Sequence, residues 1–465
     1  MRTAASTSEY DLAIIGSGGA AFSAAIAARE RDLRVVMIER GTVGGTCVNV
    51  GCIPSKALLA AAEARHRAGG QAFPGIRTDA GPVEMAALVA GKDEIVGRLR
   101  WEKYLDLADS HGIELVHGDA HFVEGLALAV GDRTIRASHY LVATGSTPRI
   151  PEVPGLADAG YLTSTTAMEL EALPTSLIVL GGGYVALEQA QLFAHLGTDV
   201  TIVARSTVAR REDPEIADAL RAALMADGIR ILEHTDVQSF RRDAAQVTVV
   251  VADTELTAER VLVATGRRPR TDALGLDVVG VELGDHDAVR FDDELRTSNP
   301  RIWAAGDVTG HPQFVYVAAR HGKTVVDNAF SAAGRHVDYA SLPRITFTNP
   351  TLASAGSTEL EAQARGLLTD SRVLDLAVVP RAIVSRSTRG LVKLVAERDT
   401  GRILGVHLVA DGAGDAILAG VYAVQAGMTV QQMADSWNPY LTIGEAMHLA
   451  AQSYTRDPAA LSCCA

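Results

Sequence analysis

The feature that most constrains this chain is a strand, glycine turn, helix, strand pattern that occurs twice. The first copy runs from Leu12–Ile15 through Gly16-Ser-Gly18-Gly-Ala-Ala21 to a second apolar run that ends at Glu39. Glycines let the backbone approach a pyrophosphate at a helix N-terminus, and an acid after the second strand can accept hydrogen bonds from ribose hydroxyls. The copy therefore predicts a dinucleotide site containing Gly16, Gly18, Ala21 and Glu39.

The second copy begins with an apolar run at Leu177 and continues through Gly181-Gly-Gly183-Tyr-Val-Ala186 to a strand that ends at Val203. A repeated fingerprint predicts two dinucleotides in one chain. A second glycine-rich turn that binds no ligand is the alternative.

The two copies differ where the acid stands. Ala204 takes the place of Glu39, Arg205 follows it, and Arg210 and Arg211 are close behind. Loss of the acid removes repulsion of a ribose 2′-phosphate, and arginines can bind that phosphate. The second site is therefore predicted to take NADPH rather than NADH, with Arg205 and Arg211 as phosphate ligands. A solvated basic turn is the alternative.

The four cysteines form two tight pairs, Cys47 with Cys52 and Cys463 with Cys464. So few cysteines, so arranged, favour redox or metal chemistry over a disulfide scaffold. The first pair lies directly after the first fingerprint, and Gly51 would help the chain bend enough to close a disulfide. Helix N-terminal amides and Lys56 are expected to lower a thiol pKa. A structural pair of buried thiols is the alternative.

Composition narrows the remaining classes of function. The 465 residues suffice for about three domains, and the net charge of −13 argues against a nucleic-acid surface. No run of some 18 apolar residues and no apolar signal core is present, which predicts a cytoplasmic protein without a membrane span. Among the 13 histidines, His117 and His121 are four apart, but Gly118 argues against a helical metal pair.

Two short echoes, Leu141–Gly145 and Leu262–Gly266, share the sequence Leu-Val-Ala-Thr-Gly and bracket the second fingerprint. Each is predicted to be a strand that ends in a tight turn, and Gly266 is expected at the NADPH site. A later strand ends at Asp307, whose carboxylate could bind a ribityl chain. After about Leu342 the pattern changes to strands and then helices without a nucleotide signature, which predicts a separate domain.

Together these motifs resemble the pyridine nucleotide–disulfide oxidoreductases of the glutathione reductase and lipoamide dehydrogenase type, from Tyr10 to the C-terminus. The resemblance implies an α/β fold with two Rossmann-like domains, for FAD and NADPH, and a C-terminal α+β dimerisation domain. It divides the chain into an FAD-binding domain at 1–150 and 268–341, an NADPH-binding domain at 151–267, and an interface domain with the cysteine tail at 342–465.

The resemblance also implies roles for individual residues. Cys52 matches the thiol next to the flavin, and Cys47 matches the thiol that exchanges with substrate. Lys56 and Glu188 match an ion pair beside the flavin ring, and Tyr184 matches the residue that covers the nicotinamide pocket. Further residues expected to line the FAD are Ala21, Gly41, Thr46, Lys56, Ala120, Asp307 and Val315.

One departure from the family concerns the substrate. Members that reduce disulfides carry a His-Pro-Thr motif whose histidine protonates the leaving thiol, whereas this chain has Trp437-Asn-Pro-Tyr440-Leu-Thr442. Adjacent cysteines at the C-terminus, Cys463 and Cys464, suit capture of a soft metal ion. The Tyr440 segment together with this tail resembles the branch of the family that reduces mercuric ion.

That branch implies a complete reaction. Hg(II) arrives as a thiol complex, Cys463 and Cys464 of one subunit of a homodimer take it, and Cys47 and Cys52 of the other subunit receive it for reduction with NADPH through FAD. Tyr184 and Tyr440 are expected to assist the transfer. The alternatives are an NADPH-dependent disulfide reductase of unknown substrate and a thiol-based metal-buffering flavoprotein.

Overall fold

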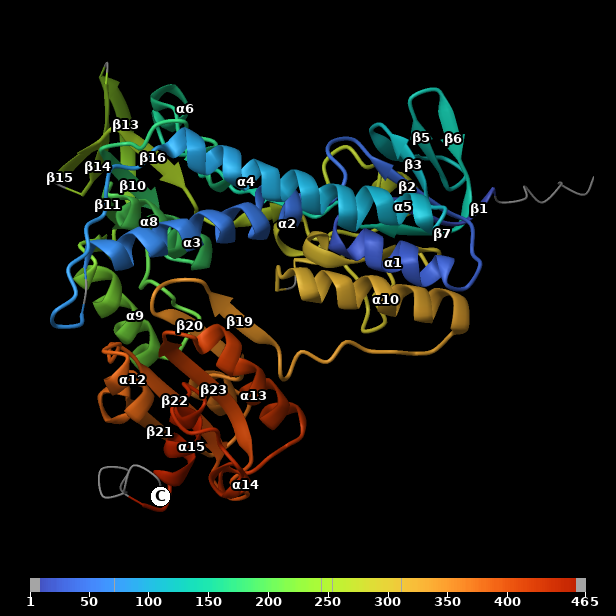
Figure 1. Cartoon of the computed structure of the whole chain (residues 1–465). Helices are drawn as coiled ribbons and strands as arrows, with labels where there is room; N and C mark the ends of the chain where they lie inside the picture. The colour runs from blue at the N-terminus through green and yellow to red at the C-terminus, as the bar shows by residue number, and fades with distance from the viewer. Residues whose placement is uncertain (1–8, 71, 244, 253, 311, 457–465) are drawn as a thin grey trace, which may run out of the picture. The chain divides into compact units, whose positions relative to one another are not determined.

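The computed structural model describes residues 9–70, 72–243, 245–252, 254–310 and 312–456, which divide into two compact units (Figure 1). Unit 1 comprises residues up to Ala57, Val89–Arg149 and Gly266–Val337, and unit 2 comprises Leu58–Leu88, Ile150–Thr265 and the residues from Asp338. Two of the five boundaries along the chain fall inside long helices, α3 (Cys52–Gly69) and α4 (Met85–Arg100). Among the described residues, no helix is both long and apolar enough to span a bilayer.

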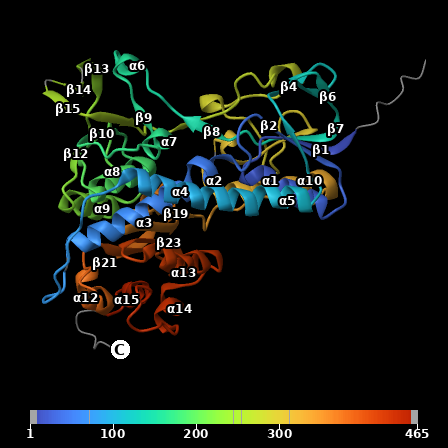
Figure 2. The ribbon, with the colours of Figure 1, turned by 45° about the horizontal axis from the view of Figure 1, so that its top comes forward.

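A parallel sheet with the order β18-β7-β1-β2-β3 forms the centre of unit 1. Its strands are β1 (Tyr10–Ile15), β2 (Val35–Glu39), β3 (Glu114–His117), β7 (Ala137–Val142) and β18 (Ile302–Ala304). Leu12 and Ile14 pack with helices α1 (Gly19–Arg29) and α10 (Val315–Ser331), which lie side by side (Figure 2). Ala13 and Ile15 pack on the opposite face, so β1 is apolar on both faces from Leu12 to Ile15.

Smaller elements complete unit 1. The opposite face of the sheet packs against an antiparallel sheet of β4 (Ala120–Val123), β5 (Ala127–Val130) and β6 (Arg133–Ile135). A two-stranded ribbon joins β8 (Ser146–Pro148) to β17 (Arg267–Pro269). Unit 1 also contains α2 (Gly45–Val50), a π-helical turn at Trp101–Leu105, α5 (Asp106–Ser110) and short 3-10 helices at Asp277–Val279, Asp285–Asp287 and Gly306–Thr309.

Unit 2 contains a second parallel sheet with the order β12-β11-β10-β16-β9. Its strands are β9 (Leu162–Thr163), β10 (Ser176–Leu180), β11 (Asp199–Val203), β12 (Arg230–Leu232) and β16 (Arg260–Val263). Around it lie the helices α6 (Leu156–Ala159), α7 (Ser164–Ala167), α8 (Tyr184–Leu196) and α9 (Pro214–Ala226). An antiparallel sheet of β13 (Val237–Asp243), β14 (Gln246–Val251) and β15 (Thr254–Ala258) covers one face.

The first glycine of each fingerprint makes the same close approach. Gly16 has φ +107°, and a Cβ there would lie 2.4 Å from the Ala143 carbonyl oxygen; Gly181 has φ +127°, and its Cβ would lie 2.3 Å from the Ala264 oxygen. Ala143 and Ala264 each occupy the third position of a Leu-Val-Ala-Thr-Gly echo. The two Leu-Val-Ala-Thr-Gly segments therefore lie directly against the glycine turns. Only glycine fits both the short distance to the alanine carbonyl oxygen and the left-handed backbone conformation.

The C-terminal part of unit 2 is an antiparallel sheet with the order β19-β20-β23-β22-β21. Its strands are β19 (Pro343–Thr346), β20 (Thr351–Gly356), β21 (Thr369–Asp375), β22 (Leu391–Glu397) and β23 (Ile403–Ala410). The helices are α11 (Glu359–Ala364), α12 (Pro380–Val384), α13 (Ala413–Gln425), α14 (Val430–Asp435) and α15 (Glu445–Gln452). The predicted α/β class, with two parallel sheets and a C-terminal α+β region, is confirmed.

Buried charges connect α9 to this antiparallel sheet within unit 2. The Lys393 ammonium, on a residue that is 1% exposed, lies 3.0 Å from carboxylates of Glu215 and Glu359 and 3.4 Å from Asp213. Nearby, Arg344 lies 3.3 Å from the Glu212 carboxylate. Such buried pairs are costly to break because the remaining charge is left without a partner.

Candidate active site

The cysteine pair of unit 1 is brought together by a sharp bend between two helices. Cys47 lies in α2, and α3 begins at Cys52. At Gly51, between them, a Cβ would lie 2.8 Å from the Thr46 carbonyl oxygen, so the chain can turn this tightly only with glycine. Cys47 is half-buried and Cys52 is exposed, and a hydrogen bond joins their side chains.

The two thiols are electrostatically unequal. The hydrogen bond with Cys52 raises the pKa of Cys47, burial and the negative charge of Cys52 raise it further, and Lys56 opposes the shift. The expected lowering of a thiol pKa is therefore wrong for Cys47. The physical reason is that a second thiolate next to an existing one is repelled, so the pair readily carries one negative charge but resists a second.

Asn49 fixes the turn that leads into α2. Its Nδ2 donates to the carbonyl oxygens of Val43 and Gly45, at 3.0 Å each, and its Oδ1 accepts a hydrogen bond of 3.3 Å from Arg100. Gly44 caps α2 with φ +109°, and a Cβ there would lie 2.6 Å from a methyl group of Val48. Local backbone geometry, rather than burial alone, therefore positions Cys47.

Tyr104 is a residue that the sequence interpretation missed. It lies in the π-helical turn, its ring packs edge-on against Phe22 at 4.9 Å between centroids, and a Cβ on Gly44 would lie 3.4 Å from its Cγ. Burial raises the pKa of Tyr104, and the charges of Cys47 and Cys52 raise it further. The phenol is thus a neutral proton donor near the thiols. No sequence spacing connects it with them, but π-helical turns often mark functional sites.

The residues around the first fingerprint fit a flavin dinucleotide. Helix α1 has Gly18 as its N-cap, with no side-chain cap and no acid in its first turn, so its N–H groups are available for a pyrophosphate. Glu39 accepts hydrogen bonds from the Ser17 hydroxyl at 2.6 Å and from the Gly41 N–H at 2.7 Å. Its carboxylate is therefore oriented at the end of β2, where the sequence predicts the ribose.

The other residues expected to line the FAD also lie in unit 1. Asp307 accepts a hydrogen bond of 2.6 Å from Ser146 at the end of β18, and Val315 begins α10. Ala120 is buried in β4, whereas Thr46 and Lys56 lie in α2 and α3.

The second fingerprint fits a second nucleotide in unit 2. Helix α8 also has a glycine N-cap, Gly183, with neither a side-chain cap nor an acid in its first turn. Ala204 is buried, and Arg205 and Arg211 are exposed. Among the residues predicted for this site, Gly181, Gly183 and both arginines belong to unit 2, whereas Gly266 belongs to unit 1.

Glu188 and Tyr184 both lie on α8. The Glu188 side chain is buried and accepts a hydrogen bond of 2.9 Å from the Phe347 N–H. Tyr184 is the first residue of the helix and is 36% exposed. Because Lys56 belongs to unit 1 and Glu188 to unit 2, their ion pair stays a prediction.

The segment that carries Tyr440 is held by one buried carboxylate. Glu445, 3% exposed, accepts hydrogen bonds from the Arg381 N–H at 2.7 Å and from the Leu441 N–H at 2.9 Å. Leu441 has φ +60°, which is unfavourable for a branched side chain, and Tyr440 is 50% exposed. Cys463 and Cys464 lie outside the described residues.

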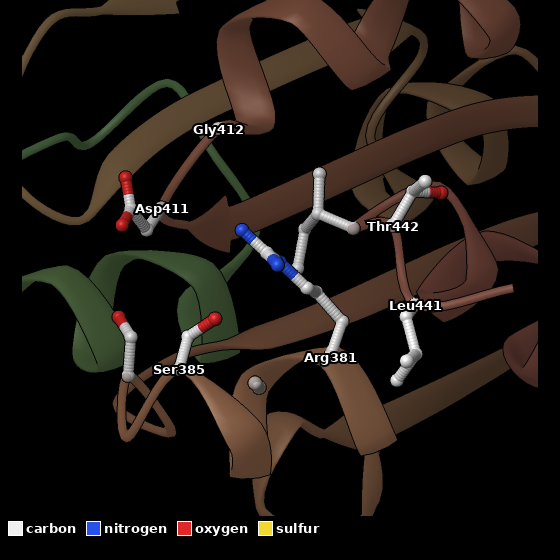
Figure 3. Close-up of a pocket in the computed structure, with 9 residues that line it drawn as sticks. Arg381, Ser385, Asp411, Gly412, Leu441 and Thr442 are labelled. Atoms are coloured by element: carbon white, nitrogen blue, oxygen red, sulfur yellow. The ribbon is translucent and has the colours of Figure 1, made fainter.

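A cavity of about 410 Å³ lies beside the Tyr440 segment. Leu441 and Thr442 form one wall, and Arg381 extends its guanidinium across the cavity toward Asp411 (Figure 3). The cavity therefore exposes a side chain of each charge next to the segment predicted to assist metal transfer.

Comparison with known proteins places the chain in a family. The family model for pyridine nucleotide-disulphide oxidoreductases matches residues 10–322, and the model for the dimerisation domain of these enzymes matches residues 342–451. The chain belongs to the pyridine nucleotide-disulphide oxidoreductases and is a flavoprotein oxidoreductase that uses a pyridine nucleotide.

Two curated relatives within the family are mercuric reductases. A mercuric reductase from Streptomyces lividans is 55% identical over 98% of both chains, and one from Staphylococcus aureus is 44% identical over 98% of this chain and 84% of its own. Among solved structures, the HOCl-induced flavoprotein disulfide reductase RclA from Escherichia coli is 29% identical, with a TM-score of 0.86 over 96% of this chain and all of its own. A Cu(II) complex of RclA is similar, with a TM-score of 0.88.

Proposed function

We propose that this protein is a mercuric reductase, which reduces Hg(II) to Hg(0) with NADPH. The identity of 55% over nearly the whole length of a mercuric reductase carries the proposal. The Tyr440 segment supports it, because the chain has no histidine there to protonate the leaving thiol of a disulfide substrate.

Cys47 and Cys52 would bind the metal ion during reduction. Hg(II) prefers two soft thiolate ligands, and the two thiols are already in contact. Reduction adds two electrons, and Hg(0), which binds thiolates weakly, leaves the pair as two thiolates. A flavin bound at Gly16, Gly18 and Glu39 would supply these electrons from NADPH bound at Gly181, Gly183 and the arginines.

The raised pKa of Cys47 bears on how the pair captures the ion. Before the ion arrives, the hydrogen-bonded pair carries one negative charge, shared between the two sulfur atoms. The first thiolate therefore attacks the incoming complex, and metal binding then makes loss of the second proton favourable. Tyr104 can donate a hydrogen bond to the departing thiolate, because its raised pKa keeps the phenol protonated and it lies near the pair.

Delivery is assigned to the C-terminal tail. Cys463 and Cys464 would take Hg(II) from its thiol complex and pass it to Cys47 and Cys52 of the other subunit in a homodimer, with Tyr440 at the transfer point. The dimerisation-domain match at residues 342–451 supports the subunit pairing. Stepwise thiolate exchange keeps the ion bound throughout.

Anaerobic turnover with Hg(II) and excess thiol tests the proposal. NADPH oxidation should depend on Hg(II) and release volatile mercury in equal amount, and Cys47→Ser or Cys52→Ser should abolish it. The RclA likeness makes disulfide reduction the second candidate function. Faster oxidation of NADPH with a disulfide than with Hg(II) would favour that candidate, and binding of Hg(II) without oxidation would favour a metal buffer.

A further inference from the structure

Three helices of unit 2 end at one point. His66 lies in the last turn of α3, His195 lies in the last turn of α8, and Asp227 is the C-cap of α9. The carbonyl end of a helix carries a partial negative charge and attracts cations. The C-terminal ends of three helices therefore favour a cation at this point through their backbone charges alone.

The side chains at this point supply metal ligands. His195 Nε2 lies 3.0 Å from one Asp227 carboxylate oxygen, and His66 Nε2 lies 3.9 Å from the other. The two imidazole rings stack with 3.8 Å between centroids, and one ligand atom from each of the three residues lies within 4.8 Å of the others. His195 and Asp227 are buried, whereas the His66 side chain is 38% exposed and leaves a route from solvent.

A hydrogen bond from Gln191 holds the Asp227 carboxylate in place. Gln191 Nε2 donates to Asp227 at 2.8 Å, and Gln191 Oε1 accepts a hydrogen bond of 2.7 Å from the Asn349 N–H. Outer hydrogen bonds of this kind orient ligands in metal sites and are worth about 10–100-fold in affinity. Asp227 can therefore keep one oxygen on Gln191 and offer the other to an ion.

Two present contacts compete with an ion. Arg389 lies 3.3 Å from Asp227, but its side chain is 53% exposed and can turn outward. His195 Nε2 carries a proton that it donates to the carboxylate, and this proton must move to Nδ1 or leave when a metal binds.

We propose that His66, His195 and Asp227 form a binding site for a borderline divalent cation such as Zn²⁺. Two imidazole nitrogens and one carboxylate oxygen are a ligand set that Zn²⁺ accepts, with a fourth position for water. The site is distinct from the thiolate chemistry proposed above, since Hg(II) prefers sulfur. Bound Zn²⁺ would join the ends of α3, α8 and α9.

Calorimetric titration with Zn²⁺ tests this site in the full-length, flavin-loaded enzyme. The Cys47–Cys52 pair is kept oxidised, and Cys463→Ser and Cys464→Ser are included, so that thiolates do not bind the ion. One Zn²⁺ per subunit is expected. His66→Ala and Asp227→Asn should each weaken binding by about 100-fold or more, and Arg389→Gln should strengthen it by removing the competing charge. The matched control, His117→Ala, removes an exposed histidine of unit 1 and should change nothing.

Two results would overturn the proposal. One is the absence of Zn²⁺ binding in both the parent and the Arg389→Gln variant. The other is binding that His66→Ala leaves unchanged, which would place the ion elsewhere. Flavin content and circular dichroism check the fold of each variant. If Asp227→Asn does not fold, the opposite effects of His66→Ala and Arg389→Gln still decide the matter.

Discussion

The two nucleotide-like repeats have the same backbone but differ in the residues at the end of their second strand. In each, a glycine with positive φ lies close to an alanine carbonyl, and a helix without a side-chain cap begins three residues later. In the first, Glu39 follows and is oriented by Ser17 and Gly41. In the second, Ala204 stands there, and the exposed Arg205, Arg210 and Arg211 follow it in the sequence. The backbone thus offers the same place for a pyrophosphate in both repeats, and the side chains beside it are predicted to select the nucleotide.

The largest expected effect tests whether the two turns serve different ligands. Gly16→Val and Gly181→Val each place a side chain within about 2.4 Å of a carbonyl oxygen. Gly16→Val should give protein without flavin, whereas Gly181→Val should keep flavin and lose pyridine nucleotide binding. Flavin absorbance after gel filtration and nucleotide titration measure the two effects. Loss of flavin from both variants would show that the turns are not separable.

The next effect concerns the choice of nucleotide. Replacing Arg205 and Arg211 by alanine and Ala204 by glutamate should shift preference from NADPH toward NADH. Each charge-assisted contact is worth about 1.5–3 kcal/mol, or roughly tenfold or more in catalytic efficiency per arginine. Steady-state kinetics with both nucleotides measure the shift, and Arg230→Ala, on β12, is a matched control. Equal efficiency with both nucleotides in the unaltered enzyme would contradict the assignment.

The second repeat is also joined to the C-terminal antiparallel sheet by charged groups, among them Glu212, which lies close to Arg344 and His407. Burial acts to raise the pKa of Glu212, but contacts with His407, Arg344 and Ser354 together lower it from 4.5 to about 2. Its stabilising effect is therefore complete above about pH 4.5 and is lost as the pH falls toward 2, and it amounts to about 3 kcal/mol.

Glu212→Gln should remove this stabilisation at neutral pH, and the difference from the parent should shrink as the pH falls below 4.5. Amide hydrogen exchange in β22 and β23 measures it. Asp272→Asn in unit 1, which breaks an exposed pair with Arg268, should cost less than about 1 kcal/mol. A difference between Glu212→Gln and parent that stays constant down to pH 2 would disprove the role of ionisation.

The smallest expected effect compares one tyrosine from each unit. Tyr104→Phe should slow reduction of thiol-bound Hg(II) by about tenfold, the value of one hydrogen bond to a charged group, and leave flavin reduction by NADPH unchanged. Tyr184→Phe should instead affect flavin reduction, because Tyr184 begins the helix after the second fingerprint. Stopped-flow measurement separates the two steps. The reverse pattern would favour the second role that the sequence predicts for Tyr184, in metal transfer, over its role at the nicotinamide pocket.

The features that could be predicted from the sequence are those that depend on local backbone conformation. Gly16, Gly181 and the strands beside them follow from conformations that few residues adopt, and the cysteine pair follows from its spacing. Tyr104 was missed because its place beside the thiols depends on a π-helical turn and on packing against Phe22. The meeting of His66 with His195 was missed for a similar reason. The two come from the ends of different helices, so no spacing in the sequence connects them.

The contact between each first glycine and an alanine carbonyl has a consequence for engineering and for evolution. The glycine turn is only half of a structural unit, and the other half is a strand that returns much later in the chain. A graft of the strand, turn and helix alone would lack the surface against which the turn is shaped. Recombination within this protein should therefore succeed only where the breakpoints keep Gly16 with Ala143 and Gly181 with Ala264.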